Sequence, residues 1–230
     1  AEEFLKIEKI DALISIWPIT AHLIAKELKN DHKIPWVADF PDLWSDTSAY
    51  QYGPIRKFFD RRLEKKTIKL ADILTTSSWP QAKILEKLHR RKFIQSIMVG
   101  YDPQKVNEPP ANLREKFTIT YTGLWQGHER DPLKLFIVLS EAISKGLINS
   151  NDVEVRFYGP QQEWIEREIK QYKLSKLVKQ YGVIPWEECL KKQRESQLLL
   201  QLNWGDKKEE GIFSGKFPEY LAARRPIVAV

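Results

Sequence analysis

Cysteine is almost absent from the 230-residue chain, because Cys189 is its only one. A single thiol excludes an internal disulfide and a zinc site built from cysteines, and it is typical of a reducing compartment. The sequence also lacks a run of about 18 apolar residues, which a membrane-spanning helix requires. Its first residues lack the order of a secretory signal. These absences predict a cytoplasmic protein, and they leave open a peripheral contact with the inner face of the membrane.

The rest of the composition is that of a folded, basic protein. Hydrophobic residues make up 42% of the chain and aromatic residues 11%, which is enough to build cores and excludes a disordered chain. The net charge of +6 suits an anionic partner such as a nucleic acid, a phospholipid surface or a nucleoside diphosphate. It equally suits a protein whose charge only keeps it in solution.

Short apolar segments alternate with helical ones along the chain, which is the pattern of parallel strands joined by helices. In the first half, strands are expected at 11–16, 34–40, 73–78 and 93–100, and helices at 20–29, 54–70 and 80–88. In the second half, strands are expected at 117–122, 153–158, 178–183, 198–202 and 226–230, and helices from 131, 161, 185 and 215. The sequence predicts an α/β protein with two Rossmann-like lobes of parallel sheet flanked by helices.

A segment that favours neither helix nor strand divides the chain. Residues 101–115 contain the adjacent prolines Pro109 and Pro110, which continue neither kind of element. We therefore expect an N-terminal lobe over 1–100, a linker over 101–115 and a C-terminal lobe over 116–230. The first half offers four strands and the last strand ends the chain, so both lobes are expected to be incomplete.

Ligands of open parallel sheets bind beyond the carboxyl ends of the strands, and one such loop follows Thr122. Gly123 lets the backbone approach a ligand, and Arg130 offers a fork of donors suited to phosphate. Asp131 is expected to be the N-cap of the next helix, and Pro132 its first residue. The alternative for Arg130 is an ordinary solvated arginine.

The loop before the last helix is a second candidate. Ser214 is expected to cap the helix, Gly215 leaves the first amides unobstructed, and Lys216 adds a positive charge, so the segment suits a diphosphate. Glu219, about one turn further on, can accept hydrogen bonds from ribose hydroxyls. The alternative is an ordinary helix start in which Glu219 only complements the helix dipole.

Two further strand ends have suitable chemistry. Residues 181–187 can offer backbone groups to a base, with Ile184 or Pro185 against its face. The alternative is a plain turn from strand to helix. Gly159 ends another strand, and its alternative role is to make room for the backbone of a neighbouring loop. No pair of histidines has the spacing of zinc ligands, so no metal site is predicted.

Several of these segments, in this order, resemble one known family. The run from Ser214 to Ile227 is similar to the donor-site motif of family-four glycosyltransferases, which have the GT-B fold. Other segments resemble the donor-lobe motifs of that family (123–132, 157–160 and 183–190) and the late part of its acceptor lobe (11–25, 34–44 and 71–78).

The resemblance implies a retaining, metal-independent transfer of a sugar from a nucleotide diphosphate to an acceptor hydroxyl, without a covalently bound cofactor. The acceptor is a saccharide or a lipid-linked molecule, as in polysaccharide, glycolipid or glycoconjugate synthesis. Arg130 and Lys216 then neutralise the departing diphosphate and Glu219 holds the ribose. The predicted donor site comprises Gly123, Arg130, Gly159, Ile184, Ser214, Gly215, Lys216 and Glu219.

The first departure from the family pattern concerns a glutamate near the sugar. Family members often have two glutamates separated by seven residues, but the position eight before Glu219 is Gly211. Glu210 lies one place further away. Either Glu210 is shifted into the role, or the site does without the first glutamate.

The second departure concerns two other slots. Many members have an arginine straight after the first donor-loop glycine and a histidine after an acceptor-lobe strand. Those slots hold Leu124 and Pro41 here. Asp39 and Asp42, which flank Pro41, are the expected substitutes for the histidine.

The helix expected over 54–70 is strongly basic, with seven basic residues against Asp60 and Glu64. Its apolar residues form one stripe: Ile55, Phe58, Phe59, Leu63 and Leu70. Because proteins that resemble this one often work on lipid-linked acceptors, one interpretation rests this face on an anionic membrane. The alternative is a stripe that faces the core, with a solvated basic back.

Two other classes of function stay open. On the same fold, a nucleotide-sugar epimerase would need no acceptor, and a sugar phosphorylase would need free phosphate and normally a pyridoxal lysine. A non-catalytic module that binds nucleotides or anions is the other class. Nucleic acid is not an expected partner, because the sequence shows no reading helix and no paired aromatic strand motif.

Overall fold

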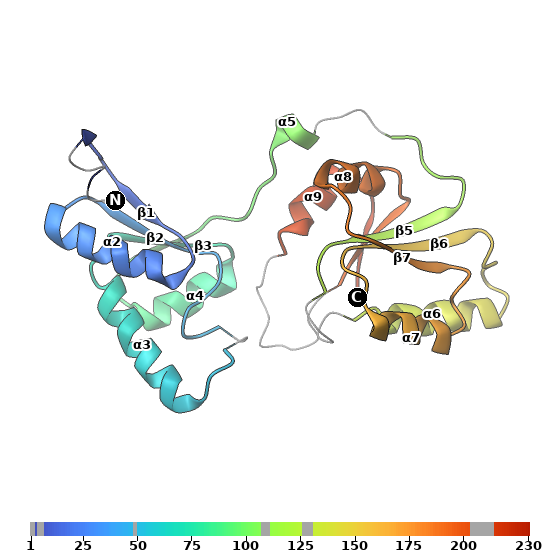
Figure 1. Ribbon diagram of the computed structural model, residues 1–230, viewed down its shortest axis with the longest axis horizontal. Coiled ribbons are helices and arrows are strands. Elements are labelled where there is room, and N and C mark those ends of the chain that lie inside the picture. Colours follow the sequence, from blue (N-terminus) through green and yellow to red (C-terminus); the bar gives the residue numbers. More distant parts are fainter. Residues whose placement is uncertain (1–2, 4–6, 48–49, 107–110, 126–130, 203–213) are drawn as a thin grey trace. The chain divides into compact units, whose positions relative to one another are not determined.

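A computed structural model describes residues 3, 7–47, 50–106, 111–125, 131–202 and 214–230. The chain divides into two compact units, unit 1 up to Val99 and unit 2 from Gly100. Each unit holds one sheet of parallel strands with helices on both faces (Figure 1). The predicted pair of Rossmann-like α/β sheets is therefore confirmed.

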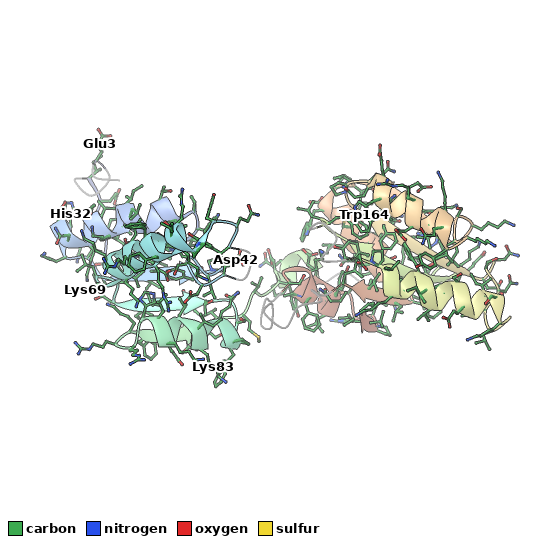
Figure 2. The ribbon with its side chains drawn as sticks, turned by 90° about the horizontal axis from the view of Figure 1, so that it is seen from below. Glu3, His32, Asp42, Lys69, Lys83 and Trp164 are labelled. Atoms are coloured by element: carbon green, nitrogen blue, oxygen red, sulfur yellow. The ribbon has the colours of Figure 1, made fainter. Side chains whose placement is uncertain are left out.

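The sheet of unit 1 has the strand order β1-β2-β3-β4, and every neighbouring pair is parallel. In chain order the elements are β1 (Leu13–Ser15), α2 (Ile19–His32), β2 (Trp36–Phe40), α3 (Pro54–Ile68), β3 (Ile73–Thr76), α4 (Trp79–Leu88) and β4 (Phe93–Ser96). Helices α2 and α3 lie on one face of the sheet and α4 on the other (Figure 2). Figure 2 also shows Asp42 at one end of unit 1, and His32 and Lys69 at the opposite end.

A polar network joins α2 to this sheet. The indole nitrogen of Trp36 donates to Ser15 Oγ at 2.8 Å, and the same oxygen lies 2.7 Å from Nδ1 of His22. His22 is only 2% exposed, and its ring stacks on Phe40 with the centroids 4.7 Å apart. Hydrogen bonds as well as apolar packing therefore hold α2 against β1 and β2.

Unfolding is expected to become easier as the pH falls below 6.5, because His22 is buried as a neutral ring. Burial lowers the pKa of His22 below its ordinary value of 6.5, although the charges of Asp39 and Glu64 act in the opposite direction. Protonation therefore favours the unfolded chain. The stability that is present above this pH is lost below it, by at most about 1.4 kcal/mol per pH unit.

Urea unfolding of the wild type and of His22→Gln at several pH values tests this prediction. The exposed His32, replaced in the same way, is the matched control. A His22→Gln variant that keeps the full pH dependence of the wild type would contradict the role of His22.

The sheet of unit 2 has the strand order β7-β6-β5-β8-β9, again with parallel pairs. Helices α6 and α7 cover one face, and α8 and α9 the other (Figure 1). The chain adds β6 and β7 on one side of β5 and then β8 and β9 on the other. The order therefore reverses between β5 and β8, and open parallel sheets bind ligands at such a point.

The elements of unit 2 agree closely with the expected ranges. In chain order they are α5 (Pro103–Val106), β5 (Phe117–Thr122), α6 (Leu133–Ser144), β6 (Val153–Tyr158), α7 (Glu163–Gln171), β7 (Val178–Gly182), α8 (Trp186–Arg194), β8 (Leu198–Gln201), α9 (Lys216–Ala222) and β9 (Ile227–Ala229). The main core lies between the sheet and the helices α6 and α7, where Tyr121, Phe136, Phe157 and Ile165 are each at most 1% exposed.

Two local predictions in unit 2 need correction. Residues 101–115 contain the short helix α5, which begins at Pro103 because proline suits a first helical position and Asp102 Oδ1 accepts from the Gln104 amide at 3.0 Å. Helix α6 begins one residue later than expected, at Leu133. Its N-cap is Pro132, although Asp131 Oδ1 still accepts from the Leu133 amide at 3.0 Å.

The core-facing interpretation of the apolar stripe on α3 is also wrong. Ile55, Phe58, Phe59 and Leu63 are exposed, at 76%, 54%, 62% and 42%. Only the end of the stripe, Leu70, is half-buried and packs against the core of unit 1.

A buried acid explains the orientation of α3. Glu64, one of the two acids among the basic residues of this helix, is only 1% exposed. Its Oε2 accepts from the Ser45 amide at 3.0 Å, and its Oε1 lies 3.0 Å from Nε2 of His89. These contacts turn the side of the helix that carries Glu64, Thr67 and Ile68 toward the unit, and the apolar stripe consequently faces outward.

Candidate functional site

The loops that follow β5, β6 and β7 are joined through their backbones at the carboxyl edge of the sheet. The Gly123 amide donates to the Tyr158 carbonyl at 2.8 Å, and the Gly159 amide donates to the Gly182 carbonyl at 2.9 Å. All three glycines have positive φ angles, 138° for Gly123, 157° for Gly159 and 83° for Gly182. The three strand ends therefore form one connected backbone surface.

Close approach explains why Gly159 is a glycine. A Cβ atom on it would lie 2.1 Å from the Gly123 carbonyl oxygen. This is the neighbouring-loop role that the sequence left as the alternative. Contact of Gly159 with a ligand stays a prediction.

Gly123 contacts the side chain of Lys216, which comes from the other side of the switch point, the place between β5 and β8 where the strand order reverses. A Cβ on Gly123 would lie 2.0 Å from Cε of Lys216 and 2.6 Å from its Nζ. Only a glycine therefore lets the Lys216 side chain lie across this loop. The structure thus brings together two residues that the sequence assigned to one site, although 93 positions separate them in the chain.

Tyr121 holds the end of the Lys216 side chain. The ammonium donates to the Tyr121 hydroxyl at 2.7 Å and lies 4.3 Å from the centre of its ring. The same hydroxyl donates to the Leu124 carbonyl at 2.9 Å, and Tyr121 is 1% exposed. A buried phenol thus places the lysine charge at the carboxyl end of β5, and sequence reasoning missed it because Tyr121 is also an ordinary core residue.

The start of α9 differs from the expectation. The N-cap position is Gly215, with φ −58° and ψ −16°, so the chain is already helical one residue after Ser214. Ser214 Oγ accepts from the Lys216 amide at 3.4 Å, and the Ser214 carbonyl accepts from the Phe217 amide at 3.0 Å. Ser214 therefore caps this turn from one position earlier than an N-cap, and the amides of Lys216 and Phe217 are engaged.

Both oxygens of Glu219 have partners on α8. Oε1 accepts from the Trp186 indole nitrogen at 3.0 Å, and Oε2 accepts from the Gln193 amide at 3.5 Å. Gln193 also donates to Thr122 Oγ1 at 2.9 Å, which ties the group to the end of β5. Burial, with the charges of Glu219 and Glu188, raises the pKa of the nearby Cys189 thiol.

Tyr220 fixes α9 against the same strand end. Its hydroxyl accepts from the Thr122 amide at 3.0 Å, and the residue has no exposed surface. Burial raises the pKa of Tyr220 to about 12, so the phenol is neutral at any physiological pH. Tyr220 lies within the run from Ser214 to Ile227, but its place beside Glu219 in the sequence does not show which strand it contacts, so this role was not predicted.

The remaining predicted residues are spread more widely. Ile184 lies two residues before Trp186, and its carbonyl is 4.0 Å from the Cys189 thiol. Asp39 and Asp42 belong to unit 1, where Asp39 Oδ1 accepts from the Thr75 hydroxyl at 2.5 Å and Asp42 is exposed beyond β2. Arg130 and Glu210 lie outside the described residues.

The arrangement in unit 2 suits an anion better than a metal. One ammonium group lies at the switch point of a parallel sheet, beside a glycine backbone, and a half-buried carboxylate follows it on the same helix. Among the described residues, no three metal-binding side chains of His, Cys, Asp or Glu come together. The expectation of a site without a metal stays a prediction.

Comparisons with solved structures agree with the fold. Sucrose-phosphate synthase from Thermosynechococcus elongatus matches with a TM-score of 0.68 and 12% identity, over 99% of this chain and 58% of that one. A mutant of TarM from S. aureus, solved with Fondaparinux, alpha-GlcNAc-glycerol and UDP, matches with a TM-score of 0.67 and 14% identity, over 99% of this chain and 43% of that one. The lipopolysaccharide outer core galactosyltransferase WaaB matches with a TM-score of 0.63 and 16% identity, over 99% of this chain and 58% of that one.

These likenesses establish the fold, which is that of GT-B glycosyltransferases. The chain spans about half the length of the structures it matches. A UDP-N-acetylglucosamine 2-epimerase structure from Listeria monocytogenes also matches, at a lower TM-score of 0.54. No family model and no curated protein matches the sequence.

No helix in the described part of the chain is both long enough and apolar enough to span a bilayer.

Proposed function

We propose that unit 2 binds the nucleoside diphosphate of a sugar donor and that the protein is a glycosyltransferase. The observation that carries this proposal is the position of Lys216, whose ammonium lies over Gly123 at the point where the strand order of a parallel sheet reverses. The GT-B fold of the chain supports it, because the matching structures include glycosyltransferases and one that contains UDP.

In the proposed reaction, negative charge grows on the diphosphate as the sugar leaves. A cation that is already in place stabilises this charge without reorganising in the transition state. Lys216 has this property, because Tyr121 fixes its Nζ. Arg130 is proposed as the second cation, and the amides of Ser214 and Gly215, which have no partner within the described part of the chain, as donors to the phosphate oxygens.

Glu219 is proposed to hold the ribose. A carboxylate can accept about four hydrogen bonds. The two from Trp186 and Gln193 therefore leave acceptor sites for two ribose hydroxyls. Gly123, Gly159 and Ile184 are proposed as backbone neighbours of the donor.

We further propose that the protein belongs to family four and transfers the sugar with retention of configuration. The proposed reaction needs neither a metal nor a covalently bound cofactor, and its acceptor is a saccharide or a lipid-linked molecule. Asp39, Asp42 and Glu210 are proposed near the transferred sugar. The proposed setting is the cytoplasm and the synthesis of polysaccharides, glycolipids or glycoconjugates.

Lys216→Ala and Glu219→Ala are each expected to weaken nucleoside diphosphate binding by about 1–3 kcal/mol, the range of charge-assisted hydrogen bonds. This corresponds to a rise in Kd of roughly fivefold to 150-fold. Calorimetric titration of the folded chain with UDP, GDP and ADP and their sugar conjugates measures it and identifies the base. Lys145→Ala, which removes an exposed lysine on unit 2, is the matched control. Equal affinities in all three variants would refute the assignment of the site.

An epimerase is the alternative function, since one matching structure is an epimerase. The reaction products distinguish it from a transferase. The protein is incubated with the nucleotide sugar that binds, with and without a saccharide acceptor. Release of nucleoside diphosphate that depends on the acceptor supports the transferase. A changed sugar on an intact nucleotide, formed without acceptor, would establish the epimerase instead.

A further inference from the structure

The outward face of α3 combines two kinds of side chain in a fixed order along the helix. Its first turns expose Ile55, Phe58 and Phe59, which are 76%, 54% and 62% exposed. Its later turns expose basic residues: Arg62, Lys65, Lys66 and, just beyond the helix, Lys69. The helix is therefore apolar at its first end and cationic at the other, on one and the same face.

The apolar end is larger than the helix alone. Tyr52, just before α3, is 58% exposed, and the Arg56 guanidinium lies 4.6 Å from the centre of its ring. An open hollow of about 490 Å³ adjoins this end, lined by Gly53, Pro54, Ile55, Arg56, Phe59 and Asp60. Contiguous apolar surface of this kind marks a site of interaction rather than ordinary exposure.

The outward charge of α3 is almost wholly positive. Glu64 is buried against Ser45 and His89, so it does not offset the cations. Asp60 accepts from the Tyr50 hydroxyl at 2.6 Å and lies 3.6 Å from the Arg56 guanidinium, so it is also compensated. Lys57 and Arg61 pair with Asp46, at 3.7 and 3.4 Å. A partner of α3 therefore meets apolar side chains together with the later basic residues, which form no ion pair within the described part of the chain.

Arg62 links the two halves. Its guanidinium lies 4.7 Å from the centre of the Phe58 ring, so a charged group and an apolar ring are in contact on this face. Basic side chains together with exposed phenylalanines are typical of helices that lie at the boundary between hydrocarbon and lipid headgroups. A nucleic acid would engage the cations but leave the exposed phenylalanines in water.

We propose that α3 docks unit 1 on an anionic phospholipid bilayer. Ile55, Phe58 and Phe59 enter the headgroup region, and the later basic side chains bind the lipid phosphates. The proposal rests on unit 1 alone and does not depend on nucleotide binding by unit 2. Neutral lipid would engage only the apolar side chains of this face, and a soluble polyanion would engage only its basic side chains.

Sedimentation of the whole chain with vesicles tests the proposal. One set contains phosphatidylcholine alone, and the other contains equal parts of phosphatidylcholine and phosphatidylglycerol. We expect binding to the second set, at least tenfold weaker binding to the first, and loss of binding as salt increases. Equal binding to both sets, or binding to neither, would overturn the proposal.

Two kinds of variant separate the contribution of the apolar side chains to membrane binding from that of the basic side chains. The double variant Phe58→Ser with Phe59→Ser is expected to lower the partition coefficient at least tenfold. Arg62→Ala and Lys66→Ala are each expected to lower it about fivefold, because each cation near an anionic surface contributes on that scale. All four side chains are exposed, so the circular dichroism spectrum should not change.

Helix α4 supplies the matched control. Trp79 is 69% exposed, and Lys83 Nζ lies 4.6 Å from the centre of its ring. Figure 2 shows Lys83 on the face of unit 1 opposite to α2 and α3. Trp79→Ser should bind vesicles as the wild type does, and a loss equal to that of the phenylalanine variant would overturn the proposal. A dimer in solution that the phenylalanine variant abolishes would also overturn it, since the face would then belong to a second copy.

Discussion

Replacing Glu64 with alanine is expected to destabilise the fold by about 3–5 kcal/mol. Glu64 is 1% exposed and accepts from the Ser45 amide, while its other oxygen contacts His89, which is 8% exposed. Removing the carboxylate leaves both partners buried without an acceptor, and each such group costs about 1–3 kcal/mol. The truncation also leaves a cavity beneath α3.

Urea unfolding of the whole chain measures this loss. Glu64→Gln keeps an oxygen for the Ser45 amide, so its loss should be clearly smaller than that of Glu64→Ala. His89→Ala completes a double-mutant cycle, and the coupling between positions 64 and 89 should be clearly above zero. A loss in Glu64→Ala of only about 0.5 kcal/mol, as at exposed positions, would contradict the buried pair.

The second large effect is expected from Gly159→Ala. The new Cβ would lie 2.1 Å from the Gly123 carbonyl oxygen, and the residue has a φ of 157°, which side chains disfavour. Overpacking and backbone strain each cost about 1–3 kcal/mol, so we expect a loss of about 3 kcal/mol in the stability of unit 2. Relief of the clash would move the Gly123 loop away from Lys216, so nucleotide affinity should fall as well.

Gly100→Ala is the control for this variant. A Cβ at Gly100 meets no atom within 4 Å, so the free energy of unfolding of Gly100→Ala should differ from that of the wild type by less than about 1 kcal/mol. Thermal and urea unfolding give the stabilities, and nucleotide titration gives the affinities. A Gly159→Ala variant as stable as the control would show that the loops after β5 and β6 are not as closely packed as the structure has them.

The fold was largely predictable because apolar periodicity reports directly on parallel strands and their crossovers. In β2, for example, Trp36, Ala38 and Phe40 are all buried, and the segment was predicted from its apolar run alone. Helix starts were less predictable. They depend on backbone angles such as those of Gly215, which a serine before a glycine does not fix.

The side of α3 that faces the core could not be predicted from the pattern of its apolar residues. An apolar stripe usually faces a core, but the exposed position of Phe58 and Phe59 follows from the burial of Glu64, whose partners Ser45 and His89 are 19 and 25 positions away. Long-range polar pairing of this kind leaves no periodic signal in the sequence.

The candidate site was predictable in part. Turn chemistry identified Gly123, Lys216 and Glu219 one by one, and the strand order then placed the first two in contact. The supporting residues Tyr121 and Gln193 were not identified. Their side chains act across the sheet or between helices, and no local motif indicates such contacts.

A nucleoside diphosphate is proposed to bind at the carboxyl ends of β5 and β8. An amide chemical-shift map of the isotope-labelled chain, titrated with the diphosphate that binds most tightly, shows where it binds. We predict that the largest saturable shifts occur at Gly123, Gly215 and Lys216, and that the shifts of Gly123 and Gly215 in Lys216→Ala need a roughly fivefold to 150-fold higher concentration of the diphosphate. Saturable shifts confined to the amino ends of the strands or to unit 1, with these three amides unmoved, would contradict binding at this site.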